Sequence, residues 1–218
     1  MSEQNKQTLE AYQKTAQRYL ENTKAHAALD PEKAERKQIK LEQFLAQSFA
    51  KYPEGANIFE IGSADGVNAA YLCQLGFNVM ASDVADGFLQ TLAAKRMKLM
   101  KFNVLTDDFP QKYDGVLAWR VFVHFTPEDV VLAAQKIHDT LKDGGRFVFN
   151  AINRAYKDKT EEWADFPGEY HMDVERFFYY HSKEELDAIL ADAGFRIVDF
   201  HEEGGETGNK WLVYVVEK

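Results

Sequence analysis

The spacing of apolar residues predicts two helices at the start of the chain. In the first, apolar side chains that include Leu9, Tyr12 and Tyr19 recur at helical spacing, so they share one face. The second begins at Asp30-Pro31, because Asp is a frequent N-cap and Pro is favoured at the first helical position. We therefore expect residues 1–52 to form two helices ahead of the first strand.

From residue 57 onward, short apolar segments alternate with helical ones. This pattern indicates a doubly wound α/β fold, a mainly parallel sheet with helices on both faces. The predicted strands are residues 57–61, 77–82, 99–105, 113–119, 146–152, 195–201 and 211–217. The predicted helices of this part are residues 67–75, 88–98, 127–141 and 183–193. The last two strands are joined by a glycine-rich turn, so we expect an antiparallel hairpin that closes one edge of the sheet.

Residues 153–176 have no sustained periodicity. Long irregular connections are uncommon in compact domains unless they serve a function, and this one leaves a strand on the side where α/β sheets bind ligands. We expect an insertion that determines substrate specificity; the alternative is a surface loop anchored by its aromatic residues. The side chains expected to line a pocket there are Trp163, Phe166, Tyr170, His171 and Arg176. The run Phe177–Tyr180 is predicted to add a strand or to pack on the core.

The composition fits one globular domain that spans residues 1–218, with 45% hydrophobic and 28% charged residues. No segment approaches the ~18 apolar residues that cross a bilayer, and the first residues lack the layout of a signal peptide. Cys73 is the only cysteine, which suits a reducing cytoplasm; we expect it in the core, on the apolar face of helix 67–75. No metal-ligand spacing is present, so we predict no metal site.

The formal charge of -9 narrows the range of partners. An acidic surface repels nucleic-acid phosphates, and the densest basic runs, residues 33–40 and 95–101, are typical of solvated helix faces. This charge argues against nucleic acid as a partner, and the lack of a long apolar segment argues against a membrane, whereas a small molecule is compatible with both. The sequence leaves open whether the chain is a monomer or a homodimer.

The segment Glu60-Ile61-Gly62-Ser63-Ala64-Asp65-Gly66, between the first strand and its helix, predicts a ligand site. The helix N-terminus offers unpaired N–H groups, and glycines allow a tight turn and close approach of a ligand. The glycines are four residues apart, which differs from the G-x-G-x-x-G pattern of dinucleotide sites. The carboxylates of Glu60 and Asp65 would repel a diphosphate but suit the ammonium and sulfonium of S-adenosylmethionine (SAM). Asp83, at the end of the second strand, can accept both ribose hydroxyls.

With these features in order, the sequence resembles the class I SAM-dependent methyltransferases over roughly residues 57–217. Residues 60–66 resemble the family's first motif, residues 113–118 its fourth-strand motif, and residues 141–145 its Leu-Lys-Pro-Gly-Gly turn with Asp143 in place of Pro. Asn103 stands where the family's adenine-contacting segment would have Asp. The resemblance implies a Rossmann-like fold with a seven-stranded sheet, a reversed strand in the terminal hairpin, and two N-terminal lid helices.

The resemblance also implies a set of cofactor contacts from the lid, the first turn, and the ends of the next three strands. The expected residues are Tyr19, Glu60, Gly62, Ser63, Asp65, Gly66, Asp83, Val84, Asn103, Val104 and Ala118. Tyr12 is a further candidate for closing over the methionine end; alternatively, both tyrosines face the core. Glu60 has a competing structural role as an acceptor for the loop amides.

Two residues after the fourth strand are candidates for work on the methyl acceptor. His124 can act as a general base, because a hydroxyl or amine loses a proton around methyl transfer; the alternative is structural packing beside the next helix. Arg120 can hold a carboxylate through a bidentate fork, or pair with an acid of the lid. The predicted reaction is methyl transfer from SAM to an O, N or S nucleophile of a small molecule.

Three other functions remain open at this stage. A tRNA-modifying methyltransferase would have a similar layout, but the acidic balance weighs against it. A protein that binds SAM or S-adenosylhomocysteine (SAH) without turnover would carry the same cofactor turn. An NAD-dependent oxidoreductase is disfavoured by the glycine spacing.

Overall fold

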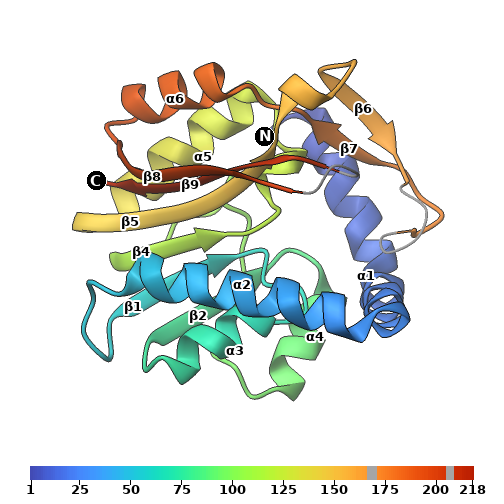
Figure 1. Cartoon of the computed structure of the whole chain (residues 1–218), viewed down its shortest axis with the longest axis horizontal. Helices are drawn as coiled ribbons and strands as arrows, with labels where there is room; N and C mark the ends of the chain where they lie inside the picture. The colour runs from blue at the N-terminus through green and yellow to red at the C-terminus, as the bar shows by residue number, and fades with distance from the viewer. Residues whose placement is uncertain (166–170, 205–208) are drawn as a thin grey trace.

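The chain begins with the two expected helices, α1 (Glu3–Leu29) and α2 (Pro31–Phe49). The computed structural model describes residues 1–165, 171–204 and 209–218. The Ser2 hydroxyl caps α1 by accepting from the Asn5 amide, and the Asp30 carboxylate caps α2 by accepting from the Lys33 amide. Figure 1 shows α1 beyond the ends of the central strands and α2 alongside the sheet.

The centre of the molecule is a seven-stranded sheet in the order β3-β2-β1-β4-β5-β9-β8. Its strands are β1 (Asn57–Ile61), β2 (Asn78–Asp83), β3 (Leu99–Lys101), β4 (Tyr113–Ala118), β5 (Leu141–Ile152), β8 (Arg196–Glu203) and β9 (Trp211–Glu217). The first five run parallel, while β9 is antiparallel to both β5 and β8. The predicted doubly wound sheet and its closing antiparallel pair are confirmed; the turn at residues 205–208 lies outside the described residues.

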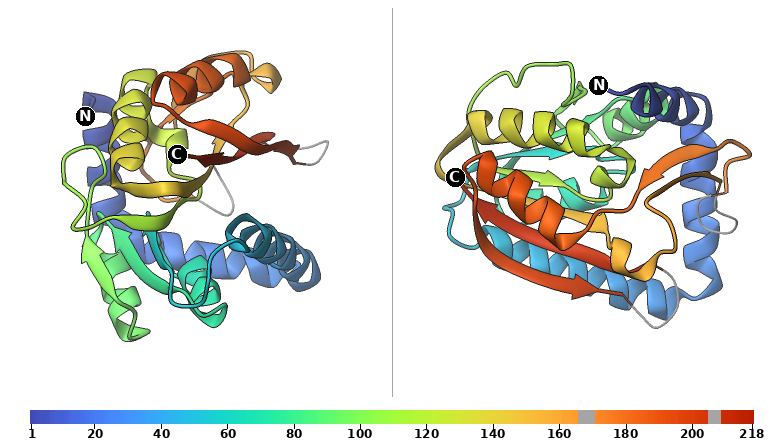
Figure 2. Two further views of the ribbon diagram at one scale, coloured as in Figure 1. Left: turned by 90° about the vertical axis from the view of Figure 1, so that its left-hand side faces the viewer. Right: turned by 90° about the horizontal axis from the view of Figure 1, so that it is seen from above.

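Helices cover both faces of this sheet, as the two turned views in Figure 2 show. These helices are α3 (Val67–Gln74), α4 (Asp86–Ala94), α5 (Pro127–Thr140) and α6 (Lys183–Asp192), with the 3-10 turn η1 (Phe122–His124) ahead of α5. On one face α2 and α3 pack Phe49 and Leu72 against strand residues such as Leu117. On the other, α5 and α6 pack Ile137 and Leu190. Because parallel strands are buried on both faces, they read as continuous apolar runs.

Two strand boundaries differ from the prediction by more than two residues. The third strand is expected to reach residue 105, but β3 ends at Lys101. The Asn103 side chain accepts from the Leu105 amide and its carbonyl accepts from the Asp107 amide, so the backbone turns there. The fifth strand begins earlier than expected, at Leu141, which pairs with Tyr113 across an irregularity in the ladder.

The expectation that residues 153–176 are irregular throughout is wrong. After the short turn η2 (Arg154–Tyr156), β6 (Glu161–Ala164) pairs antiparallel with β7 (Arg176–Tyr179) in a separate two-stranded sheet. The cross-strand contact between Trp163 and Phe177, with ring centroids 5.6 Å apart, holds the pair together. The strand predicted at Phe177–Tyr180 is confirmed.

The prediction that Cys73 is a core residue is also wrong, since its side chain is exposed. Helix α3 buries Ala69 and Leu72 instead, so Cys73 lies just beyond the buried face. Among the described residues, no helix combines the length and apolar character needed to cross a membrane.

Candidate active site

A cavity of about 200 Å³ lies at the carboxyl ends of β1, β2 and β4, under α1. Its walls come from the turn after β1, the ends of β2 and β3, the segment after β4, and one face of α1. The lining residues that the sequence predicts are Tyr12, Tyr19, Gly62, Ser63, Asp65, Asp83, Val84, Asn103, Val104, Arg120 and His124. No described residue of α2 lines it, because α2 packs Leu45 and Phe49 on the sheet.

The turn after β1 takes its shape from backbone conformations that favour glycine. Gly62 has φ +70°, Ala64 φ +44° and Gly66 φ +75°. A Cβ on Gly62 would lie 2.7 Å from Val121 Cγ2, and a Cβ on Gly66 would lie 2.6 Å from Leu92 Cδ2. The chain therefore passes close to its neighbours at both glycines, and α3 begins with no side-chain cap. The Val67 amide at the start of α3 donates to Asp65 Oδ1 at 3.2 Å, and Asn68, one residue further along, lines the cavity.

Asp83 ends β2 with its carboxylate buried at the cavity wall. Its Oδ2 accepts from the Ala64 amide at 3.0 Å, and its Oδ1 accepts from the Val84 and Ala85 amides at 2.7 and 3.1 Å. Burial raises the pKa of Asp83 to about 6, although the three amides lower it. Asp83 thus ties the β1 turn to the β2 end, and its remaining lone pairs face the cavity.

Glu60 lies one layer behind the cavity wall. It is buried on β1, and hydrogen bonds from the Ser63 and Asn68 side chains stabilise its charge, but burial dominates and raises its pKa to about 7. Its Oε2 has no hydrogen-bond partner among the described residues. Ser63 and Asn68 themselves line the cavity. Gly66 and Ala118 also belong to the elements that form the wall, but neither lines it.

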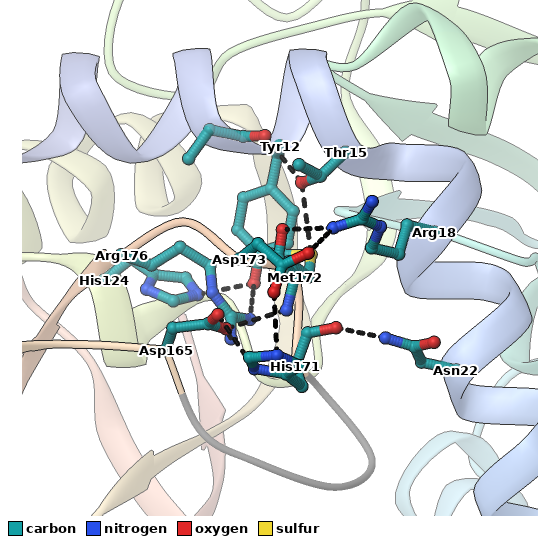
Figure 3. Close-up of polar contacts among 11 residues, drawn as sticks. Tyr12, Thr15, Arg18, Asn22, His124, Asp165, His171, Met172, Asp173 and Arg176 are labelled. Atoms are coloured by element: carbon teal, nitrogen blue, oxygen red, sulfur yellow. Dashed lines mark hydrogen bonds and ion pairs between the residues drawn. The ribbon is translucent and has the colours of Figure 1, made fainter.

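His124 of η1 and Tyr12 of α1 contact each other at the cavity wall (Figure 3). His124 Nδ1 lies 2.6 Å from the Phe177 carbonyl oxygen, and its Nε2 lies 2.9 Å from the Tyr12 hydroxyl. A carbonyl only accepts, so Nδ1 carries the proton and Nε2 accepts from Tyr12. Burial and the Arg176 charge lower the pKa of His124 to about 4, so the ring is neutral near pH 7. Arg176 donates to the Tyr12 oxygen at 3.4 Å.

Arg120 follows β4 and lines the cavity in a strained backbone conformation, with φ +61°. Its amide donates to Asn150 Oδ1 at 2.6 Å, which holds that conformation. Its guanidinium stacks on the Trp211 ring, 5.4 Å from the centroid. Non-glycine residues in the left-handed region cost about 1–3 kcal/mol and gather at functional sites. Arg120 and Ala64 are the two described non-glycine residues on the cavity wall with this backbone conformation, and Arg120 is the one with a side chain that can bind a ligand.

The described residues expected from the 153–176 insertion, Trp163, His171 and Arg176, do not line the cavity. Trp163 is 39% exposed and rests on Phe177, and neither Trp163 nor His171 lines the cavity. Tyr170, like Phe166, lies outside the described residues. Arg176 is buried behind Tyr12, where its guanidinium lies 3.6 Å from Asp165.

His171 belongs instead to a polar network that ties this segment to α1, which we call the lid latch: Arg18, Asn22, Asp165, His171 and Asp173 (Figure 3). His171 lies 3.0 Å from Asp165 and 2.8 Å from Asp173. Arg18 pairs with Asp173, and the Asn22 amide donates to the His171 carbonyl. The His171 and two Asp side chains are close enough to share a cation, but Arg18 and Arg176 already balance both carboxylates.

Several lining residues escape the sequence motifs. Asn5, Thr8 and Leu9 line the cavity from α1, and Phe88 does so from α4. The helical spacing of positions 5, 8, 9 and 12 is the one signal that places them on a shared face. That signal does not distinguish a cavity wall from an ordinary packed face.

Comparison with known proteins identifies the family. Residues 33–199 match the family model described as a methyltransferase domain. The chain therefore belongs to the class I SAM-dependent methyltransferase family. No curated protein matches it in sequence.

Solved structures share the fold at low sequence identity. Magnesium protoporphyrin IX methyltransferase from Synechocystis, solved with bound SAM, has a TM-score of 0.74 at 13% identity, over 100% of this chain and 98% of that one. A SAM-dependent methyltransferase from Methanosarcina mazei has a TM-score of 0.67 at 16% identity, over 77% and 94%. A SAM-dependent methyltransferase from Clostridium acetobutylicum has a TM-score of 0.65 at 15% identity, over 81% of this chain and 89% of that one.

Proposed function

We propose that this chain binds SAM in the cavity under α1 and transfers its methyl group to a nucleophilic O, N or S atom of a small molecule. The observation that carries the proposal is the joining of the Gly62–Gly66 turn and Asp83 in one cavity roofed by α1. Family membership and SAM-bound structural neighbours support it.

The polar groups of the cavity fit the parts of SAM. The unpartnered Oε2 of Glu60, behind Ser63 and Asn68, supplies negative charge for the ammonium of the methionine end. Asp83 accepts hydrogen bonds from the ribose hydroxyls. Val84 and the Asn103-Val104 segment contact the base, and Tyr19 covers the cofactor from α1. The carboxylates of Asp65 and Asp83 on the wall, with Glu60 behind it, favour a cationic amino-acid ligand over a diphosphate. Gly62, Ser63, Asp65, Gly66 and Ala118 shape the binding surface.

SAM, when bound, supplies a methyl group activated by its sulfonium. The protein then contributes orientation, exclusion of water by α1, and a route for the acceptor's proton. The acceptor X–H gives its proton to the Tyr12 oxygen while the Tyr12 proton passes to His124 Nε2, 2.9 Å away. Burial lowers the pKa of His124 to about 4, so its Nε2 lone pair is available near pH 7 but the ring is a weak base. It therefore takes the proton only as the acceptor atom gains the methyl group and becomes strongly acidic.

The enclosure of the cavity favours a small acceptor over a nucleic acid. Helix α1 covers it, and Arg120 is the cation on its wall next to β4. A guanidinium offers a planar pair of donors that matches a carboxylate. We therefore propose an acceptor that carries an acidic group, held by Arg120.

The test is SAH release from SAM, measured by mass spectrometry across a panel of small carboxylic acids that carry a hydroxyl, amine or thiol. We expect turnover of at least one acid and loss of turnover in Tyr12→Phe, with SAH affinity retained. Binding of SAM without any turnover would instead favour the non-catalytic SAM-binding function. Arg120→Lys keeps the positive charge but removes the two parallel donors of the guanidinium, so we expect a raised KM for the acceptor.

A further inference from the structure

Asn5 is a buried polar residue of α1 that no motif accounts for. It is 1% exposed and its side chain lies at the cavity wall. Neither Oδ1 nor Nδ2 has a hydrogen-bond partner among the described residues. A side-chain amide offers two donor hydrogens and two acceptor lone pairs. Burying all of them unpaired is unfavourable, so this side chain is suited to a ligand that brings its own donor and acceptor.

A role in capping α1 does not account for Asn5. Ser2 is the N-cap, which places Asn5 at the third helical position, where a capping-box side chain would bond back to the N-cap amide. The Ser2 amide donates instead to Asp129 Oδ1 at 2.9 Å, and the Ser2 hydroxyl donates to Asp129 Oδ2 at 2.5 Å. Asp129 therefore accepts the hydrogen bond from the Ser2 amide that the Asn5 side chain would accept in a capping box.

The first turns of α1 lie against the loop that follows β3. Met1 Sδ is 3.2 Å from Asn103 Nδ2. Leu9, one turn after Asn5, lines a second hollow together with Val84 and Asn103. Met1 and Leu9 lie one helical turn on either side of Asn5, so Asn5 lines the cavity beside the loop that follows β3.

The Asn103 side chain, the residue that the sequence motif offers for adenine, is already engaged. Its Oδ1 accepts from the Leu105 amide at 3.0 Å, and its Nδ2 faces Met1 Sδ. Asn103 shapes the loop by these contacts. The side-chain amide with both groups available beside this loop, among the described residues, is that of Asn5.

We propose that the Asn5 side-chain amide recognises the adenine base of the cofactor. Its Oδ1 accepts from the 6-amino group, and its Nδ2 donates to a neighbouring ring nitrogen. This inference rests on the proposed function, since it assigns one end of the SAM site. An asparagine amide matches this donor–acceptor pair on adenine in two parallel hydrogen bonds. The lid helix thereby contributes specificity for the base as well as cover.

The test compares SAH with its analogue that lacks the 6-amino group, each titrated by calorimetry into wild-type protein and into Asn5→Ala. The wild type is expected to bind SAH about tenfold more tightly than the analogue, as one bidentate base contact gives. Asn5→Ala is expected to weaken SAH about tenfold and to bind both ligands within about twofold, because the interaction with the amino group is absent. Gln7→Ala, on the exposed side of the same helix, is the control and should behave as wild type.

Thermal unfolding of the ligand-free proteins separates this role from a structural one. Removal of an unpaired buried amide should leave the melting temperature of Asn5→Ala unchanged or higher, whereas a structural Asn5 would lower it. The inference is overturned if wild type binds SAH but Asn5→Ala binds it equally, or if the variant still discriminates the analogue as wild type does. Failure of the wild type to bind SAH and SAM at all would instead overturn the proposed function.

Discussion

At the scale of single residues, Gly62 is a cavity-lining position where a side chain is poorly tolerated. Its φ of +70° strains any other residue, and an added Cβ would meet Val121 Cγ2 at 2.7 Å. We predict that Gly62→Ala loses about 1–2 kcal/mol of unfolding free energy from the strain and weakens SAM binding at least tenfold. Chemical denaturation and calorimetric titration measure the two effects.

Gly55 provides the matched control for that substitution. It also has a left-handed backbone, with φ +83°, but an added Cβ would be 4.0 Å from its nearest neighbour, Asn78 Nδ2, outside the cavity. Gly55→Ala should therefore lose similar stability and keep wild-type SAM affinity. Equal SAM affinity in both variants would show that the turn at Gly62 is not part of the cofactor site.

Glu60 makes stability and binding depend on pH in opposite directions. Burial raises its pKa from 4.5 to about 7, so its contribution to ligand-free stability is fully present below pH 4.5 and is lost as pH rises through about 7. The loss is on the order of 3 kcal/mol for a shift of this size. Denaturation curves at several pH values should show that the unfolding free energy of Glu60→Gln increases relative to that of the wild type as pH rises.

SAM affinity should change the other way, because the ammonium of SAM favours ionised Glu60. We expect wild-type affinity to increase between about pH 5.5 and pH 8, with a flatter profile in Glu60→Gln. Asp83, whose pKa is raised to about 6, titrates in both proteins; its charge acts on Glu60 less than burial does, so the comparison mainly reports Glu60. Identical profiles would remove Glu60 from the cofactor site.

The residues that sequence reasoning places at the cavity are those in local motifs. Gly62 and Asp83 stand at fixed offsets from a strand, so their positions follow from the pattern alone. Asn5 and the pairing of Tyr12 with His124 depend on where α1 crosses the sheet ends, which no local pattern specifies. The apolar neighbours of Cys73 predict a core position, but α3 buries Ala69 and Leu72 and leaves Cys73 just beyond its buried face.

At the scale of elements, the lid latch ties α1 to the segment before β7. Its Arg18 and Asp173 side chains are 50% and 62% exposed, so their ion pair contributes about 0–1 kcal/mol to stability. We predict that Arg18→Ala leaves the melting temperature nearly unchanged but increases the dissociation rate of SAH several-fold, because α1 opens more often. Stopped-flow displacement measures the rate.

A second exposed ion pair supplies the control for the latch. Arg36 and Glu32 lie on α2, with 66% and 88% of their side chains exposed, and α2 does not line the cavity. Arg36→Ala should leave SAH dissociation unchanged. An Arg18→Ala rate equal to that of Arg36→Ala would mean that the latch does not hold the lid.

The alternation of strands and helices was predictable because each element buries a continuous apolar run or stripe. The order of the central strands and the antiparallel β9 agree with the family resemblance. The early end of β3 follows from side-chain capping by Asn103, and β6 is short and partly exposed, so neither gives a periodic signal. The assignment of residues 1–218 to one domain stays a prediction.

At the scale of the whole molecule, the charge of -9 opposes binding to polyanions. We predict no measurable binding of tRNA at physiological salt by fluorescence anisotropy. Affinity that appears at low salt and decays steeply with added salt would favour the tRNA-modifying alternative.

The central claim is that the cavity under α1 is a SAM site, and parallel calorimetric titrations with SAM, SAH and NAD test it most directly. We predict that each chain binds one molecule of SAM or of SAH and does not bind NAD. Binding of NAD in place of SAM, or binding of none of the three, would contradict it.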